Sequence, residues 1–433
     1  MRLPCPSTDD KMSTMDAKAY IAELTRQARV AAGVLATSNG ARRDEAIRAC
    51  AAALRANKAA LQAANQKDVD RAPQFGLTAA MIDRLRLTDK TIAAMADALE
   101  QIASQTDPVG QALAAYNRPD GLRIEKRRVP IGVIGFIYES RPNVTTDAAG
   151  LFLKSGNACI LRGGKEALYS NLAVAACVRQ AVADAGLPAA AVAMIDNPDR
   201  EIVAAMAQAE GGIDLIIPRG GEALIRAVTD VATVPVIKHY TGNCHVYVHA
   251  DADEAVARAI VRNAKCQRPG VCNAAETLLV HAAHIQSGLL KQLLDDLASA
   301  GVSLRGDERT RAMHADVTLA DESDWASEYL DLILAVRVVD DLEQAVEHIN
   351  RYGSHHTDAI VTRGLADAER FTAAVDSASV MVNASTRLAD GGVYGLGAEV
   401  GISTDKLHAR GPMGAEDLTT YKWIVTGQGH LRE

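Results

Sequence analysis

Cys272 is the residue of this sequence best placed to act as a nucleophile. It lies in the turn Gln267-Arg-Pro-Gly-Val-Cys-Asn273, just before a predicted strand. The nearby cations Lys265 and Arg268 would favour the thiolate, which is the reactive form of a cysteine. A second interpretation stays open, because a cysteine in an apolar setting is often an inert packing residue. The adjacent Cys266 ends a predicted helix, and we expect it to be structural.

Asn143 is a candidate for the hydrogen-bond donor that stabilises the oxyanion in acyl-transfer chemistry. It stands in Tyr138-Glu-Ser-Arg-Pro-Asn-Val144, in the first turn of a helix that Pro142 starts. A side-chain amide there can donate to a developing oxyanion, and the positive end of the helix dipole adds to the effect. An ordinary polar helix start has the same composition, so this residue alone does not decide between the two.

Two glycine pairs follow predicted strands and precede helices, which is the usual geometry for holding a phosphate or a ribose. One is Arg162-Gly-Gly-Lys165, and the other is Gly220-Gly221 before Glu222. Neither matches the G-x-G-x-x-G pattern of dinucleotide-binding folds, and each would also serve as a plain turn. Both pairs are therefore candidates for cofactor contacts.

The eleven histidines form no recognisable metal-binding pattern. His245 and His249 are four residues apart, but on a predicted strand that spacing separates the side chains by ~13 Å. His355 and His356 form a pair predicted at the tip of a loop. No spacing matches a known zinc-ligand pattern, so the sequence predicts no metal site.

The composition is that of a globular protein with a large core. The chain has 433 residues, which at roughly 150 residues per domain indicates about three units, and 48% of them are hydrophobic. Aromatic residues make up 4% and the net charge is −8, so we expect no surface for nucleic acid or an anionic membrane. No apolar run approaches the roughly 18 to 20 residues that span a bilayer. Seven cysteines without a C-x-x-C pair fit a reducing cytoplasm.

The elements that must position these residues are predicted as a helical start followed by two α/β series. Residues 16–107 show helical periodicity, and residues 1–15 are expected to be a disordered polar tail. Strands and helices then alternate over 131–243 and again over 244–388. This order predicts parallel sheets covered by helices, the first of them doubly wound.

Residues 112–130 change character and predict a β-hairpin around the turn at 116–121. The C-terminal segment 419–425 is strand-like and can pair with that hairpin. An exposed strand edge needs a partner, and a second copy of the chain is the usual one.

Several segments together resemble one branch of the aldehyde dehydrogenase superfamily, the family of γ-glutamyl phosphate reductases (glutamate-5-semialdehyde dehydrogenases). The resemblance covers about residue 15 to the C-terminus. The segments that carry it are PIGVIGFIYESRPNV (130–144), LRGGKE (161–166), QRPGVCN (267–273), VNASTR (382–387), GLGAE (395–399) and KLHARGPMG (406–414).

The resemblance implies an aldehyde-dehydrogenase-like α/β fold made of a doubly wound cofactor domain, an α/β catalytic domain and a β-hairpin oligomerisation flap. The implied boundaries are 16–111 and 131–243 for the NADP-binding domain, 244–388 for the catalytic domain with its nucleophilic cysteine, 112–130 and 412–433 for the flap, and 389–411 for a return to the cofactor domain. The flap implies a homo-oligomer, either a dimer or a tetramer.

The activity that the resemblance implies is NADPH-dependent reduction of L-glutamate 5-phosphate to L-glutamate 5-semialdehyde and phosphate, in cytoplasmic proline biosynthesis. The Cys272 thiolate would displace phosphate, the Asn143 amide and the Cys272 backbone N–H would hold the oxyanion, and the thioester would accept a hydride. A non-catalytic member would be expected to have lost this pair of residues. The acyl phosphate is labile, so a glutamate kinase is a further expected partner.

Two departures from other aldehyde dehydrogenases bear on the chemistry. Hydrolytic members carry a glutamate before a Gly-Gly as the base for water, whereas the matching stretch 238–243 has no carboxylate. NAD-preferring members often carry a glutamate three residues after the position of Lys165, where this chain has Leu168. Arg162 or Lys165 can then pair with the 2′-phosphate of NADPH. The sequence therefore favours phosphate-using chemistry with NADPH over hydrolytic aldehyde oxidation.

The remaining site residues also come from the resemblance. Glu328, in Ser327-Glu-Tyr-Leu330, resembles the superfamily glutamate that holds the nicotinamide ribose, and an exposed carboxylate is the alternative. For the substrate α-carboxylate the candidates are Arg141, Arg387 and Arg410, each of which would equally serve in a structural ion pair.

Overall fold

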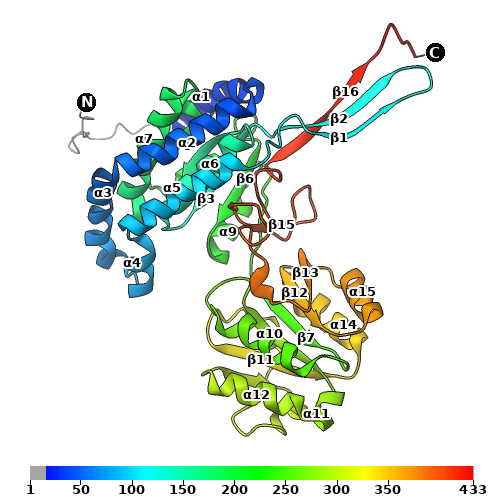
Figure 1. Ribbon diagram of the computed structural model, residues 1–433. Helices are drawn as coiled ribbons and strands as arrows, with labels where there is room; N and C mark the ends of the chain where they lie inside the picture. Colours follow the sequence, from blue (N-terminus) through cyan, green and yellow to red (C-terminus); the bar gives the residue numbers. More distant parts are fainter. Residues whose placement is uncertain (1–15, 433) are drawn as a thin grey trace.

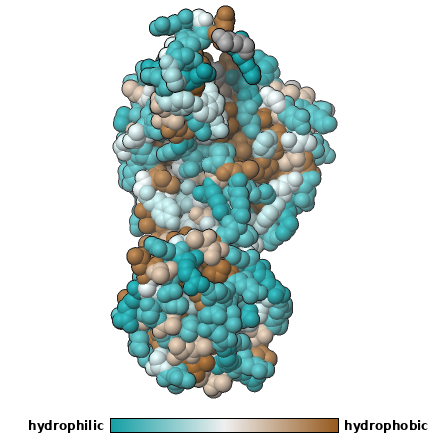
Figure 2. Space-filling view, turned by 90° about the vertical axis from the view of Figure 1, so that its right-hand side faces the viewer, coloured by the Kyte–Doolittle hydropathy of each residue, from teal (hydrophilic) through white to brown (hydrophobic). Residues whose placement is uncertain are grey.

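The computed structural model describes residues 16–432, so the tail predicted at 1–15 lies outside the described residues. Figure 1 shows two lobes and a long arm that projects from one of them. Seen from the side of the arm, the lobes meet at a waist (Figure 2). Every helix within residues 16–432 is too short or too polar to cross a bilayer.

The first lobe contains a parallel four-stranded sheet with the order β5-β4-β3-β6. Its central strand β3 is buried along its whole length, as expected of a parallel strand covered on both faces. Because chain order runs from β3 through β4 to β5 and then returns to β6 on the other side, the crevice between β3 and β6 is the topological switch point. The strands are β3 (Val133–Tyr138), β4 (Ala158–Arg162), β5 (Val192–Met194) and β6 (Leu215–Arg219).

The helices of residues 17–104 pack against this sheet or against the helices that cover it, which confirms the predicted helical start. Leu35 and Leu99 belong to the same buried cluster as Ile134 and Phe136 of β3. The helices of the lobe are α1 (Ala17–Thr37), α2 (Gly40–Ala56), α3 (Lys58–Arg71), α4 (Ala79–Leu85), α5 (Asp89–Ser104), α6 (Pro142–Lys154), α7 (Leu168–Asp184), α8 (Arg200–Ala207) and α9 (Glu222–Thr229).

The second lobe is built on a seven-stranded parallel sheet with the order β10-β9-β11-β8-β7-β12-β13. The strands are β7 (Cys244–Val248), β8 (Ala275–His281), β9 (Ser303–Gly306), β10 (Thr318–Leu319), β11 (Ile333–Val339), β12 (Thr357–Val361) and β13 (Ser379–Val382). The predicted α/β fold class, with a doubly wound sheet followed by a second α/β lobe, is confirmed.

Two hydrophobic clusters flank this second sheet. Leu293 and Leu297 pack with Val246 on one face, and Ile349 and Phe371 pack with other strand residues on the opposite face. The helices of the lobe are α10 (Glu254–Cys266), α11 (Ala283–Ser287), α12 (Leu289–Ser299), α13 (Glu308–Arg311), α14 (Leu342–Tyr352) and α15 (Leu365–Ala374).

The arm is an antiparallel sheet of β1 (Ala112–Asn117), β2 (Arg123–Pro130) and β16 (Thr419–Thr426) in the order β1-β2-β16. The predicted hairpin and its pairing with the C-terminal strand are confirmed. Between the second lobe and β16, the chain returns through β14 (Ile402–Ser403) and β15 (Gly411–Pro412). Met413 and Leu418 on this return path belong to the core of the first lobe.

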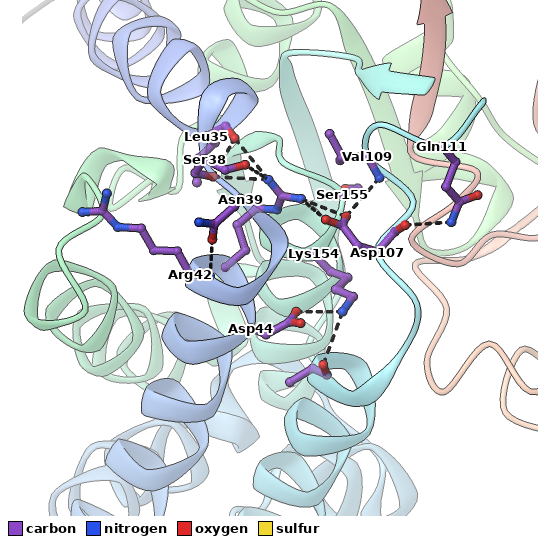
Figure 3. A network of polar contacts seen from close by, with 12 residues as sticks. Leu35, Ser38, Asn39, Arg42, Asp44, Asp107, Val109, Gln111, Lys154 and Ser155 are labelled. Carbon is purple, nitrogen blue, oxygen red and sulfur yellow. Dashed lines mark hydrogen bonds and ion pairs between the residues drawn. The ribbon is translucent and has the colours of Figure 1, made fainter. Parts of the chain in front are cut away.

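A buried ion-pair network ties the root of the arm to the first lobe (Figure 3). The Arg43 guanidinium, only 1% exposed, donates to both carboxylate oxygens of Asp107 at 2.8 and 2.7 Å. Asp107 in turn accepts from the Val109 amide at 3.0 Å, at the start of the segment that leads into β1. The nearby Lys154 is equally buried and pairs with Asp44 at 2.7 Å.

Replacing Asp107 with alanine should lower the free energy of unfolding by about 3 kcal/mol, because Arg43 would remain buried without a counter-charge. Urea unfolding followed by circular dichroism measures this effect. The matched control is Asp97→Ala, which removes an exposed partner of Arg55 and should cost less than about 1 kcal/mol. Equal losses in the two variants would contradict the structural role of the buried pair.

Candidate active site

A cleft of about 440 Å³ lies at the waist between the two lobes. The first lobe contributes residues that follow β3 and β6, at the switch point of its sheet, where doubly wound folds bind ligands. The second lobe contributes the loop before β8 and the segment before β11. Of the predicted site residues, the cleft brings together Arg141, Gly220, Gly221, Cys272 and Glu328.

Cys272 lies half-buried in the loop between α10 and β8, as predicted from the sequence. Its carbonyl oxygen accepts from the Cys244 thiol at 3.2 Å. The backbone of Gly242 packs so closely against it that a Cβ at position 242 would lie 2.0 Å from the Cys272 carbonyl oxygen. Residues 238–243, which include no carboxylate, therefore pack directly against the loop that carries Cys272. None of the six cysteines in residues 16–432 forms a disulfide.

The prediction that Lys265 favours the Cys272 thiolate is wrong. The Lys265 ammonium donates to the Glu276 carboxylate at 2.6 Å, and both side chains are fully buried. Burial lowers the pKa of Lys265, while the Glu276 charge opposes that shift. Glu276 also accepts from the Leu330 amide at 3.1 Å, so this pair positions one wall of the cleft instead of activating the thiol.

Asn143 begins α6 beside two residues that line the cleft, Arg141 and Val144, but is not itself part of the lining. Its amide donates to the Asp147 carboxylate at 3.1 Å, one turn later on the same helix. Burial raises the pKa of Asp147 to about 6. An amide nitrogen carries two hydrogens, so this bond fixes the orientation of the Asn143 side chain and leaves one donor free.

Arginines gather on the first-lobe side of the cleft. Burial lowers the pKa of Arg141, and the neighbouring charges of Arg219 and Arg84 lower it further. Both neighbours line the cleft, and sequence reasoning missed them. Arg219 directly precedes the Gly220-Gly221 pair, which was an available signal, whereas Arg84 on α4 reaches the cleft only through tertiary packing.

The other two predicted substrate arginines differ in their surroundings. Arg387 donates to the Gln267 side chain at 2.9 Å, on the cysteine loop, and its pKa is lowered by burial and by Arg268. Arg410 pairs with Asp376 at 2.8 Å, which matches the alternative of a structural ion pair. Neither Arg387 nor Arg410 is part of the cleft lining.

Four of the predicted cofactor residues, Arg162, Lys165, Gly220 and Gly221, lie at the carboxyl ends of β4 and β6, on the same edge of the parallel sheet. The Gly221 amide donates to the Glu139 carboxylate at 2.8 Å. The Arg162 guanidinium donates to the Pro198 carbonyl at 2.9 Å, and the Lys165 ammonium lies 5.3 Å from the centre of the Phe75 ring. Neither Arg162 nor Lys165 has an ion-pair partner among residues 16–432.

Glu328 is half-buried in the cleft and not an exposed carboxylate. It accepts from the Gly242 amide at 2.8 Å, and burial raises its pKa. The glutamate thus links the second lobe to the stretch that supports Cys272.

Two histidines lie near Cys272, which the sequence did not predict, and the prediction that His356 lies at the tip of a loop is wrong. His239 lines the cleft, and His356 is fully buried just before β12. Burial lowers the pKa of His356 to about 4. These residues lie 33 and 84 positions from Cys272 along the chain, so no local spacing pattern could reveal their proximity.

Comparisons with known proteins agree with this geometry. The aldehyde dehydrogenase family model matches residues 1–314. The γ-glutamyl phosphate reductase of Rhodopirellula baltica is 52% identical over 423 residues, covering 98% of this chain and 97% of that protein. The enzyme of the same name from Moorella thermoacetica is 53% identical over 408 residues, covering 94% of this chain and 97% of its own.

The crystal structure of γ-glutamyl phosphate reductase from Thermotoga maritima superimposes with a TM-score of 0.93 at 45% identity, covering 95% of this chain and 100% of that one. The similarity therefore extends over both lobes and the cleft between them. The chain belongs to the aldehyde dehydrogenase family, in the branch of the γ-glutamyl phosphate reductases.

Proposed function

We propose that the protein reduces L-glutamate 5-phosphate to L-glutamate 5-semialdehyde and phosphate with NADPH, as a step of proline biosynthesis. The observation that carries the proposal is the position of Cys272, which lines the same cleft as the arginine group of Arg84, Arg141 and Arg219. The substrate carries an anionic group at each end, an acyl phosphate and an α-carboxylate. An arginine cluster is well suited to bind such groups.

In the first step, the Cys272 thiolate attacks the acyl carbon of the substrate. The carbon–sulfur bond forms, the bond between that carbon and the phosphate oxygen breaks, and phosphate leaves. The free donor of the Asn143 amide and the Cys272 backbone N–H stabilise the oxyanion of the tetrahedral intermediate. Arg141 and Arg387 are the candidates for the α-carboxylate, and Arg84 and Arg219 are the candidates for holding the departing phosphate.

In the second step, the thioester carbon takes up a hydride and the Cys272 thiolate leaves, which gives the aldehyde. NADPH, when bound, supplies that hydride. The residues at the sheet edge fit this cofactor, because Arg162 and Lys165 form no ion pair within residues 16–432 and are available to a 2′-phosphate, while Leu168 offers no repulsive carboxylate. We assign Gly220, Gly221 and Glu328 to the remaining contacts with the cofactor.

Water is a poor competitor of the hydride in this site. The stretch 238–243 packs directly against Cys272 through Gly242 and contains no carboxylate. Glu328 reaches this stretch, but one of its oxygens is held by the Gly242 amide. A thioester without a general base for water is expected to persist until hydride or phosphate reaches it.

The arm supports a further part of the proposal, a homo-oligomer of two or four copies. Residues of β1 are exposed along its length, and β16 exposes Tyr421, Trp423 and Val425. Large apolar side chains on a projecting three-stranded sheet gain burial only against another surface. We propose that a second copy of the chain provides that surface.

The reaction is tested in reverse, by oxidising the semialdehyde with NADP⁺ in the presence of radiolabelled phosphate. We expect one labelled acyl phosphate for each NADPH formed at early times. The same assay with NAD⁺ should give a kcat/KM at least about tenfold lower, because NAD⁺ lacks the phosphate that Arg162 and Lys165 would bind. NADPH formation without label in an acyl phosphate would contradict the proposed reaction.

A further inference from the structure

Three side chains with metal-ligating atoms converge at the nucleophile. The Sγ of Cys272 and one imidazole nitrogen from each of His239 and His356 all lie within 4.8 Å of one another. The two imidazole rings meet edge to face, with centroids 5.6 Å apart. These residues come from the stretch that supports the cysteine loop, from the loop itself and from the start of β12.

His356 provides an independent indication of a ligand. Its side chain is fully buried, and its Nε2 atom has no hydrogen-bond partner among the described residues. The other ring nitrogen, Nδ1, lies 2.9 Å from the Thr357 hydroxyl and 3.7 Å from the Cys244 thiol. Buried polar atoms are nearly always satisfied by protein, water or an ion, so an unpartnered Nε2 calls for an explanation.

The charges around His356 favour a cation. The carboxylates of Asp358, Glu328 and Glu399 all act electrostatically on its ring, and Arg219 acts in the opposite sense. A Cys272 thiolate would add a fourth negative charge. The site therefore offers both donor atoms and the charge needed to balance a divalent ion.

The donor set identifies the class of ion. One thiolate and two imidazoles suit Zn²⁺ or Co²⁺, whereas Mg²⁺ and Ca²⁺ require oxygen ligands. Donors around a tetrahedral zinc lie ~3.5 Å apart, given bonds of about 2.0 to 2.3 Å, so the side chains need to close by roughly 1 Å. His239 and Cys272 line the cleft, which gives the ion an entry path and leaves its fourth position open to water.

We propose that His239, Cys272 and His356 bind one thiophilic divalent cation of the Zn²⁺ class, and that this binding reversibly inhibits the enzyme. Binding replaces the thiol proton of Cys272 with the metal and releases that proton, with no change in oxidation state. The inhibition rests on the proposed function, since it requires Cys272 to be the nucleophile. Metal binding itself does not depend on the proposed function.

Cobalt(II) is the probe, because a cobalt–thiolate bond produces an intense charge-transfer absorption in the near ultraviolet. Titration of the chelator-treated full-length protein should reach saturation at one equivalent of Co²⁺, and Zn²⁺ should displace it. Cys272→Ser should abolish the band. His239→Ala and His356→Gln should each weaken Co²⁺ binding at least about tenfold, since loss of even an outer-shell partner costs that much. His355→Ala, at the adjacent half-buried histidine, is the matched control and should bind Co²⁺ normally.

Absence of the band in wild-type protein at excess Co²⁺, or a band unchanged by both histidine substitutions, would overturn the site. If His356→Gln fails to fold, His239→Ala still tests the proposal. The His239 side chain makes no hydrogen bond within residues 16–432 and lies at the wall of the cleft, so its loss should leave the fold intact. Activity in the presence of a chelator is measured in parallel. A cobalt band in a protein without reductase activity would support the metal site and refute the proposed function. Reductase activity that is insensitive to the chelator, in a protein without a cobalt band, would support the proposed function and refute the metal site.

Discussion

Cys272→Ser should lower kcat by at least roughly 10³-fold while leaving the fold intact. A serine hydroxyl is hardly ionised at neutral pH, whereas a cysteine supplies an appreciable fraction of thiolate. The nearby imidazoles would help little, because burial lowers the pKa of His356 to about 4 and makes it a weak base. The measurement is steady-state turnover, with circular dichroism to verify the fold.

Cys266→Ser is the control for this substitution. Cys266 is half-buried at the end of α10, six residues from Cys272, and we expect the serine variant to keep nearly full activity. If Cys272→Ser retains more than about a tenth of the wild-type turnover, the nucleophile is another residue.

Asn143→Ala should lower kcat by roughly 10²- to 10³-fold, the usual loss when one oxyanion donor is removed. The KM for substrate should change much less, because the charge on the oxygen develops only in the transition state. The hydrogen bond from Asn143 to Asp147 orients the other N–H of the Asn143 amide before the substrate binds. A change in KM alone would show that Asn143 positions the substrate and does not stabilise the oxyanion.

The Asp147→Asn variant keeps the Asn143 amide and changes only the residue that orients it, so it tests the effect of that orientation separately. The substituted side chain keeps an oxygen that can accept from Asn143, so we expect a smaller loss of kcat than for Asn143→Ala. An equal loss in both variants would indicate that the first turn of α6 has been disrupted in each.

Local patterns in the sequence were sufficient for the elements that carry the site. The proline at the start of α6 and the turn before β8 are encoded within a few residues, and they placed Asn143 and Cys272 correctly on their elements. The hairpin and the C-terminal strand were also predicted, because alternation and turn residues mark strands directly.

Such local patterns could not predict contacts between segments that lie far apart in the sequence. Arg84 and His356 approach the cleft from a helix far upstream and a strand far downstream of Cys272, and only the packing of both lobes brings them there. Lys265 is different, because a signal was present. It lies four residues after the buried Val261 on α10, so helical periodicity already placed it on the covered face of that helix.

The most direct test of the phosphate-using mechanism is the pre-steady-state time course of the reverse reaction in phosphate-free buffer. With semialdehyde and NADP⁺, we expect a burst of one NADPH per active site followed by a stall, because the Cys272 thioester lacks the general-base help that is typically worth roughly 10²- to 10⁴-fold. Phosphate, or arsenate in its place, should then restore turnover in proportion to its concentration. Continuous turnover at full rate without phosphate would contradict the mechanism and place this enzyme among the hydrolytic aldehyde dehydrogenases.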